Sequence, residues 1–222
     1  MANRLYYNTV APLLHKTLID LMKIEQLKQF VLVGGTSLSL QVGHRESVDI
    51  DMFTDAEYNT IDFESIESYL RSKYKYVDSF GSGVISFGKS FYIGESADNF
   101  VKLDLFYTDN FIRPSLLVDD IRLANIDDIV AMKVDVIARK GRKKDFWDLH
   151  ELFDRYSIEK MIELHKERYP YSHNKVEILE NFIAFEDADD DLDPICMRGR
   201  HWEVVKLDFI DAVKDFRDKR RT

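Results

Sequence analysis

The chain is poor in cysteine and in long apolar runs. Cys196 is its only cysteine, which excludes an internal disulfide and a cysteine-based zinc cluster. No apolar run approaches the length of a membrane-spanning helix, and the opening MANRLYYNTV lacks the apolar segment of a signal peptide. We therefore expect a cytoplasmic protein with no membrane partner.

Paired histidines and an excess of positive charge are also missing. The six histidines show no H-E-x-x-H or other paired spacing, which argues against a zinc hydrolase. A formal net charge of −9 argues against a general, non-specific nucleic-acid binder, because lysine and arginine dominate that affinity. The 222 residues, 45% of them hydrophobic, suffice for one domain or for a domain with a helical companion.

What the chain does contain is a dense pattern in residues 31–53, VLVGGTSLSLQVGHRESVDIDMF. The second half predicts a strand, in which successive side chains point to opposite faces. Ser47, Asp49 and Asp51 then share one face. Two carboxylates held so close repel each other unless a cation lies between them, and a hard divalent ion, Mg²⁺ (or Mn²⁺), is the usual one.

The first half of this pattern predicts a turn from a strand into a short helix. Gly34 and Gly35 follow an apolar run and precede the hydroxyl residues Thr36 and Ser37. Free amides and hydroxyls at a helix N-terminus can bind a phosphate, and either hydroxyl is a candidate for that contact. A metal site next to a phosphate site indicates nucleotide chemistry.

In the order glycine turn, short helix and D-x-D strand, this stretch resembles the polymerase-beta-like nucleotidyltransferase superfamily. The string GGTSLSLQVGHRESVDIDMF is similar to the AbiEii/AbiGii-type toxin nucleotidyltransferases. The superfamily often has serine directly after the glycine, where this chain has Thr36. The resemblance covers about residues 30–155 and implies an α+β fold, in which a mixed sheet with flanking helices is followed by a helical C-terminal part.

Helical spacing and turn residues predict the remaining elements of the first half. Helices are expected at 9–29, capped by Asn8 or Thr9, at 36–42, and at 62–74, capped by Asp62. Strands are expected at 30–33, at 47–54, and in an antiparallel meander at 76–80, 84–87, 91–93 and 100–107. A connection with a short apolar piece, Leu116 to Val118, is expected over 108–125.

The last strand of the meander contains a third acid, Asp104. In NFVKLDLFYT the apolar Val101, Leu103 and Leu105 alternate with it, so Asp104 projects from the face opposite them. A carboxylate in a central strand is costly unless it is paired or bound to a metal. The resemblance implies that Asp104 completes the metal site of Asp49 and Asp51. An acid exposed to water on an edge strand is the alternative.

Glycine almost vanishes from Ile126 onward and helical periodicity takes over. We therefore place a nucleotidyltransferase core at 1–125 and a helical part, packed against that core, at 126–222. Helices are expected at 126–140 and, after Gly141, at 143–156, with Phe146 and Trp147 in their core. The acidic segment EDADDDLDP fails the calcium-loop pattern and is expected to be a solvated loop.

Several charged residues become site candidates through the same resemblance. The positions that match the toxin-like family on the two predicted helices are Lys133, Arg139, Lys144, Asp145 and Asp148. A lysine is a point charge suited to a triphosphate, and Asp145 and Asp148 lie on one helical face, where they could orient a base, a lysine or the acceptor hydroxyl. Arg45 could steady the carboxylates, contact a phosphate, or form a structural ion pair.

The chain is thus predicted to be a metal-dependent nucleotidyltransferase that moves NMP from an NTP to a hydroxyl acceptor. Predicted catalytic residues are Asp49, Asp51, Asp104, Lys133 and Asp145, and predicted nucleotide-binding residues are Gly34, Gly35, Thr36, Ser37, Arg45, Ser47, Lys133, Lys144 and Asp148. Family members act as toxins of toxin–antitoxin pairs, and some modify tRNA, which makes an antitoxin and an RNA acceptor the expected partners. The alternatives are a catalytically silent nucleotide- or RNA-binding module and, less consistent with the order of Lys102 and Asp104, a metal-dependent nuclease.

Overall fold

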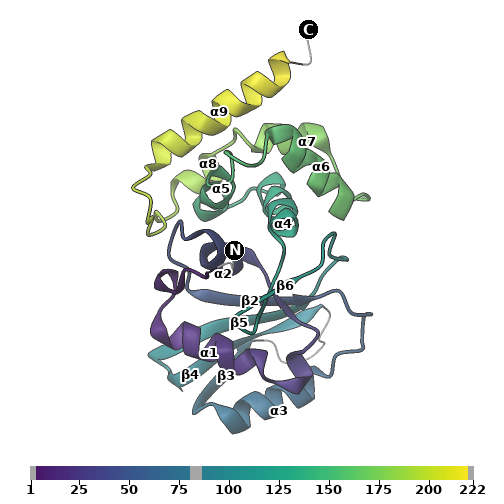
Figure 1. Cartoon of the computed structure of the whole chain (residues 1–222), viewed down its shortest axis with the longest axis vertical. Helices are drawn as coiled ribbons and strands as arrows, with labels where there is room; N and C mark the ends of the chain where they lie inside the picture. Colours follow the sequence, from purple (N-terminus) through teal and green to yellow (C-terminus); the bar gives the residue numbers. More distant parts are fainter. Residues whose placement is uncertain (1–3, 81–86, 220–222) are drawn as a thin grey trace. The chain divides into compact units, whose positions relative to one another are not determined.

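The chain folds into two compact units, coloured along the sequence in Figure 1. The computed structural model describes residues 4–80 and 87–219. Unit 1 comprises Met1–Gly43 and Ser47–Asn125, and unit 2 comprises His44–Glu46 and Ile126–Thr222. The division after Asn125 falls where the change in composition lies, but the short segment His44–Glu46 belongs to unit 2.

Unit 1 is built on a mixed sheet whose order, among the described residues, is β3-β4-β5-β2-β1-β7-β6. Its strands are β1 (Val31–Leu32), β2 (Asp49–Thr54), β3 (Tyr76–Phe80), β4 (Gly88–Ser96), β5 (Asn99–Tyr107), β6 (Leu116–Val118) and β7 (Ile121–Leu123). The neighbours β3, β4 and β5 pair antiparallel, as the predicted meander requires. Strand β5 then pairs parallel with β2, which joins two segments far apart in the sequence.

Helices α1 and α3 pack against the strands of this sheet and close the core of unit 1 (Figure 1). The helices of this unit are α1 (Pro12–Met22), α2 (Gly34–Val42) and α3 (Phe63–Lys73), with short 3-10 helices at Tyr7–Thr9 and Glu25–Leu27. Their buried leucines and phenylalanines meet the apolar side of β2, β4 and β5. Every second residue of β5 from Val101 to Leu105 is buried, so the acid of this strand lies on the other side of the sheet.

The first helix is shorter than predicted, and its predicted cap is wrong. Helix α1 begins at Pro12 with Ala11 as its N-cap. Proline suits this first position because its fixed φ is helical and because an N–H at this position has no acceptor within the helix, so its absence costs nothing. The residue before a proline disfavours helical geometry, so the helix does not extend further back. Thr9 instead lies in a separate 3-10 helix, where its hydroxyl donates to the carbonyl of Tyr6. By contrast, Asp62 caps α3 as predicted and accepts from Ser65 N.

The predicted connection over 108–125 contains a hairpin that the pattern did not reveal. Strands β6 and β7 are joined by Asp119 and Asp120, which both have positive φ, as in the turns that favour tight hairpins. Strand β7 pairs parallel with β1. Strands this short carry too little alternation to be recognised in the sequence. The strand predicted at 84–87 lies, except for Phe87, outside the described residues.

Unit 2 is helical in all of its regular structure that the described residues contain. Its helices are α4 (Ile126–Ala138), α5 (Lys143–His150), α6 (Ile158–Arg168), α7 (Lys175–Asn181), α8 (Glu186–Asp189) and α9 (Trp202–Asp218). Phe146 and Trp147 are 1% and 2% exposed, which confirms their predicted place in the core. Phe146 contacts the rings of Phe185, Trp202 and Phe209.

The acidic segment of unit 2 is largely exposed, as predicted, but it is only in part the loop that its composition predicts. It begins as helix α8, and its later carboxylates and carbonyls bind the start of α5. Lys143 N donates to Asp191 Oδ2 at 2.9 Å, and Lys143 Nζ donates to Asp191 O at 2.7 Å and to Asp193 Oδ1 at 2.9 Å. The acids thus compensate a lysine that is only 5% exposed, a pairing that composition alone does not indicate.

Among the described helices, none combines the length and the apolar character that crossing a membrane requires.

Candidate active site

Two predicted carboxylates lie directly opposite each other on neighbouring parallel strands. In the register of β2 and β5, Asp51 pairs with Asp104, and Asp49 pairs with Lys102. All four side chains are half-buried and lie on the side of the sheet that faces away from the apolar core, because the residues that alternate with them are buried. The predicted alternation around Asp104 is confirmed, and β5 is an interior strand.

A lysine accompanies this row of acids, which the sequence pattern did not mark as part of the site. Lys102 Nζ donates to Asp104 Oδ2 at 2.5 Å. Burial lowers the pKa of Lys102, but the hydrogen bond and charge of Asp104, together with the charges of Asp49 and Asp51, raise that pKa above its usual value overall. The ammonium group therefore neutralises part of the negative charge that the three carboxylates place on this face.

The glycine turn touches the same acids. Val33 is the N-cap of α2, and its N–H donates to Asp51 O at 2.8 Å. Gly34 has φ +66°, and a Cβ at this position would lie 2.9 Å from Asp51 Oδ2. An L residue is strained at such a φ and would also push against the carboxylate. Glycine is thus required here for two reasons, and the first turn of α2 comes close to Asp51.

The two candidate hydroxyls are buried and hydrogen-bonded inside unit 1. Thr36 Oγ1 lies 2.8 Å from Ser47 Oγ and also donates to Asp49 O. Ser37 Oγ accepts from Gln41 Nε2 at 3.1 Å. Thr36 therefore fastens the start of α2 to the residues around Asp49, and the contact between either hydroxyl and a phosphate stays a prediction.

The donor chemistry of the three acids suits a hard divalent cation. As the side chains of the described residues stand, no group of three or more His, Cys, Asp or Glu is arranged to hold a metal ion. Asp104 Oδ1 is nevertheless buried and has no hydrogen-bond partner among those residues. Carboxylate oxygens are the ligands that Mg²⁺ prefers, so Asp49, Asp51 and Asp104 fit such an ion if it takes the position of the Lys102 ammonium.

Four of the remaining predicted site residues, Arg45, Lys133, Asp145 and Asp148, lie in a second, buried cluster within unit 2. Asp148 is fully buried and lies at its centre. Its Oδ1 is 2.7 Å from His44 Nε2 and 2.6 Å from Arg45 Nε, and its Oδ2 is 2.8 Å from Arg45 Nη2 and 2.6 Å from Lys133 Nζ. Burial raises the pKa of Asp148, but the charges of Arg45 and Lys133 and the hydrogen bond from His44 hold that pKa well below its usual range.

Lys133 is shared between two carboxylates of helix α5. Its Nζ lies 2.6 Å from Asp145 Oδ1 as well as from Asp148, and the side chain is 8% exposed. Burial lowers the pKa of Lys133, and the charges of Asp148 and Asp145 more than reverse this, so that its pKa is raised. Asp145 Oδ2 also accepts from Arg142 N and thereby starts the helix.

Arg45 forms a buried ion pair, which was one of the three roles considered for it. The segment that carries Arg45 is held by an antiparallel bridge to Cys196, with hydrogen bonds from Glu46 N to Ile195 O and from Met197 N to His44 O. Lys144 is half-buried, whereas its neighbour Lys143, which no pattern marked, is the buried lysine of this helix. The nucleotide-binding roles of Arg45, Lys133, Lys144 and Asp148 stay predictions.

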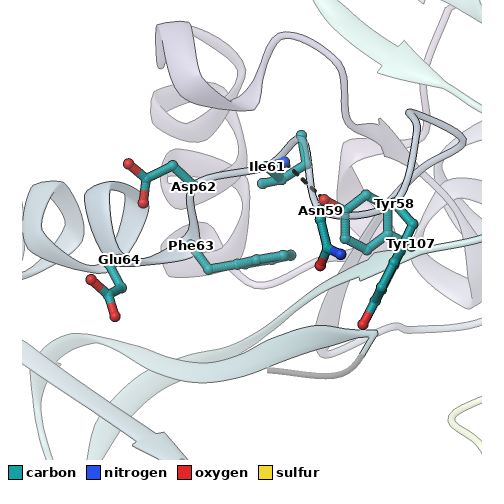
Figure 2. A pocket seen from close by; sticks show the side chains of 7 residues that line it. All are labelled: Tyr58, Asn59, Ile61, Asp62, Phe63, Glu64 and Tyr107. Atoms are coloured by element: carbon teal, nitrogen blue, oxygen red, sulfur yellow. Dashed lines mark hydrogen bonds between the residues drawn. The ribbon is translucent and has the colours of Figure 1, made fainter. Parts of the chain in front are cut away.

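The cavity of about 220 Å³ shown in Figure 2 is separate from the row of acids. It lies beside the loop before α3, where Tyr107 Oη accepts from Ile61 N at 2.8 Å. Tyr107 packs against the core of unit 1, on the side of the sheet opposite to Asp104. None of the predicted site residues lines this cavity.

A family model described as "Nucleotidyl transferase AbiEii toxin, Type IV TA system" matches residues 17–221. The chain belongs to this AbiEii family. The resemblance read from the glycine turn and the D-x-D strand is therefore confirmed, and the chain is a nucleotidyltransferase of a toxin family. An uncharacterized protein of Aquifex aeolicus is 29% identical over 204 residues, which cover 84% of this chain and 87% of the relative.

Solved structures show that the AbiEii fold of this chain recurs at low sequence identity. A putative nucleotidyltransferase from H. pylori has a TM-score of 0.58 at 20% identity, covering 93% of this chain and 95% of its own. JHP933 from Helicobacter pylori has a TM-score of 0.57 at 18% identity, with coverages of 93% and 92%. MenT4, a nucleotidyltransferase toxin from Mycobacterium tuberculosis, has a TM-score of 0.56 at 14% identity, with coverages of 89% and 80%. These likenesses confirm the predicted α+β nucleotidyltransferase fold.

Proposed function

We propose that this AbiEii-family chain transfers a nucleoside monophosphate from an NTP to a hydroxyl group of an acceptor, with Mg²⁺ or Mn²⁺ held by Asp49, Asp51 and Asp104. The observation that carries the proposal is the direct pairing of Asp51 with Asp104 on adjacent strands, next to the side-chain-free Gly34. A phosphate and a cation can meet there without a side chain between them.

The residues of unit 1 would divide the work between binding and proton transfer. The amides of Gly34 and Gly35, at the positive end of α2, would bind the triphosphate. Asp104 Oδ1 has no hydrogen-bond partner in the described part of the chain and would take the proton of the acceptor hydroxyl. The acceptor oxygen then forms a bond to the α-phosphorus. At the same time the bond between the α-phosphorus and the oxygen that bridges it to the β-phosphorus breaks, and pyrophosphate leaves. A bound Mg²⁺ would stabilise the charge on these oxygens.

Lys133 and Asp145 are proposed to act through the cluster that they form with Asp148. Each charge in this cluster is matched by another buried charge, as a buried ionic group requires. Lys133 would bind a phosphate group only if it exchanged one of its two carboxylates. With its present partners, Lys133 can instead help Asp148 to hold the segment of Arg45 in place, and this positioning role needs no exchange of partners.

The acceptor and the partner are proposed from the family. The family description names a type IV toxin–antitoxin system, which supports an antitoxin as partner of this chain. We propose RNA, and tRNA in particular, as the acceptor. A catalytically silent nucleotide-binding module is the alternative, and the retention of all three acids favours the enzyme.

The proposal is tested by incubating the protein with each labelled NTP, Mg²⁺ and total RNA. We expect label to be incorporated into RNA, and we expect Asp49→Ala to abolish incorporation while leaving the circular dichroism spectrum unchanged. Asp98→Ala, which removes an exposed carboxylate from the same unit, is the matched control and should incorporate label normally.

Each other outcome identifies a different function. Binding of an NTP without incorporation into any acceptor would support the silent module. Shortened RNA would support a nuclease. Wild-type incorporation by Asp49→Ala would show that the metal assignment is wrong.

A further inference from the structure

Two phenylalanines continue the row of acids along the same face of the sheet. Phe53 follows Asp51 by two residues on β2, and Phe106 follows Asp104 by two residues on β5, so all four lie on one face. Phe53 and Phe106 are partners in the strand register. Their ring centroids are 6.0 Å apart in an edge-on arrangement, directly beyond the facing carboxylates.

These rings are outside the apolar core of unit 1. Both side chains are only partly buried, whereas Met52, Thr54 and Leu105, which alternate with them on the opposite face, are fully buried. Phe106 faces Gly88 on β4, where a Cβ would lie 2.6 Å from Phe106 Cα and 2.6 Å from Phe106 Cδ1. The glycine leaves the ring room to lie over the neighbouring strand, so the sheet presents an aromatic surface next to its carboxylates.

The glycine turn lies beside the carboxylates of the same face. Thr36 contacts Ser47 and Asp49, and Gly34 contacts Asp51, so α2 begins beside the first two acids of β2. From Asp49 to Phe53 the strand advances by four residues, or about 13 Å. The face thus offers the amides of the α2 start beside the carboxylates of Asp49 and Asp51, and aromatic rings beyond those carboxylates.

We propose that Phe53 and Phe106 bind the nucleobase of the incoming NTP by stacking. An NTP likewise has an anionic polyphosphate, which suits the amides and a cation at the carboxylates, and a flat aromatic base, which suits the rings beyond them. Stacking on aromatic side chains suits any base because every base has a π-face. This inference rests on the proposed function, and it predicts affinity for NTPs in general with weak preference among the bases.

The test is a comparison of NTP with inorganic tripolyphosphate, which has the same phosphate chain and no base. We expect Phe106→Leu and Phe53→Leu each to weaken binding of an NTP roughly 5- to 100-fold, from the size of base–aromatic stacking. Binding of tripolyphosphate should stay at the wild-type level. Dissociation constants are measured by calorimetry with Mg²⁺ present.

Two further variants control for folding and for loss of an aromatic ring in general. Phe106→Tyr keeps the ring and should restore NTP binding. Phe100→Leu removes a ring from the same face of β5, but on the other side of Asp104, where Phe100 contacts Tyr92. It should leave NTP binding unchanged. Equal loss of NTP and tripolyphosphate binding in Phe106→Leu would overturn the inference.

Unchanged NTP binding in both leucine variants would also overturn the inference. If these variants weakened binding of RNA instead, the rings would serve the acceptor and not the nucleobase of the NTP. Failure of the proposed function has a different signature. In that case the wild-type protein itself would bind NTP without incorporating label into any acceptor, or would bind neither NTP nor tripolyphosphate.

Discussion

At the scale of single residues, the acids of unit 1 depend on neighbours that supply charge or leave space. Lys102 lies opposite Asp49 in the strand register and donates to Asp104, while Gly34 leaves room at Asp51. The lysine places a positive charge where three carboxylates would otherwise repel one another. A divalent ion bound by the same carboxylates has to compete with this ammonium group.

Replacing Lys102 tests that competition. We expect Lys102→Met to tighten binding of Mn²⁺, roughly tenfold, because the ion no longer displaces a paired ammonium group that the nearby acids hold through charge and a hydrogen bond. Titration of Mn²⁺ followed by its electron paramagnetic resonance signal measures the affinity. Lys89→Met, which removes a lysine paired with Glu67 instead, is the control and should leave the affinity unchanged. Weaker binding by Lys102→Met would show that the lysine assists the metal.

At the scale of elements, one carboxylate of α5 connects three segments of unit 2. Asp148 pairs with Lys133 on α4 and with His44 and Arg45 from the segment before β2. The cluster is buried, so removing one charge leaves the others uncompensated. Its effect on stability is therefore expected to exceed that of an exposed ion pair.

For Asp148→Asn we expect a loss of about 3 kcal/mol in the free energy of unfolding at pH 7, in the range for a broken buried pair. The pKa of Asp148 is lowered in the folded state, so its contribution is complete above its unfolded pKa of about 3.9 and is lost as pH falls through the folded pKa. The difference between variant and wild type should therefore be constant from pH 7 to about pH 5 and shrink below about pH 4.

Tryptophan fluorescence during urea unfolding measures this effect, because Trp147 and Trp202 both lie in unit 2. Asp154→Asn, at an exposed position after α5, is the control. A difference that persists unchanged at pH 3 would contradict the assignment. Loss of nucleotide incorporation by Lys133→Met without a change in the unfolding midpoint would favour the catalytic role predicted for Lys133.

At the scale of the whole molecule, unit 2 is not a continuous piece of the chain. Its segment His44–Glu46 comes between α2 and β2, two elements of unit 1. That segment supplies Arg45 to Asp148 and is bridged to Cys196. A cut after Asn125 therefore does not separate the two units cleanly.

We accordingly expect a fragment of residues 126–222 to unfold at a lower urea concentration than the same region in the intact chain. The fragment lacks both His44 and Arg45, so of the ion-pair partners that Asp148 has among the described residues it retains Lys133. Asp148→Asn should therefore cost less stability in the fragment than in the intact chain. Tryptophan fluorescence follows urea unfolding of the fragment and of the intact chain. Equal unfolding midpoints for the two would contradict the expectation.

Much of the candidate site could be read from neighbouring residues. Alternation along β2 placed Asp49 and Asp51 on one face, and alternation along β5 placed Asp104 opposite the core residues. The glycine turn and the D-x-D strand were enough to indicate the AbiEii family, which the match over residues 17–221 confirmed. These features depend on the period of a strand and on the chemistry of a turn, which are local properties.

Only the tertiary structure decided which distant residues meet. The register that sets Asp51 opposite Asp104 and Lys102 opposite Asp49 joins segments that are far apart in the sequence, and so does the pairing of Arg45 with Asp148. Strand register and the pairing of buried charges arise from the packing of whole elements against one another. A local sequence pattern does not determine that packing. The sequence by itself determined the chemical inventory of the site and its family, and folding determined the partner of each charge.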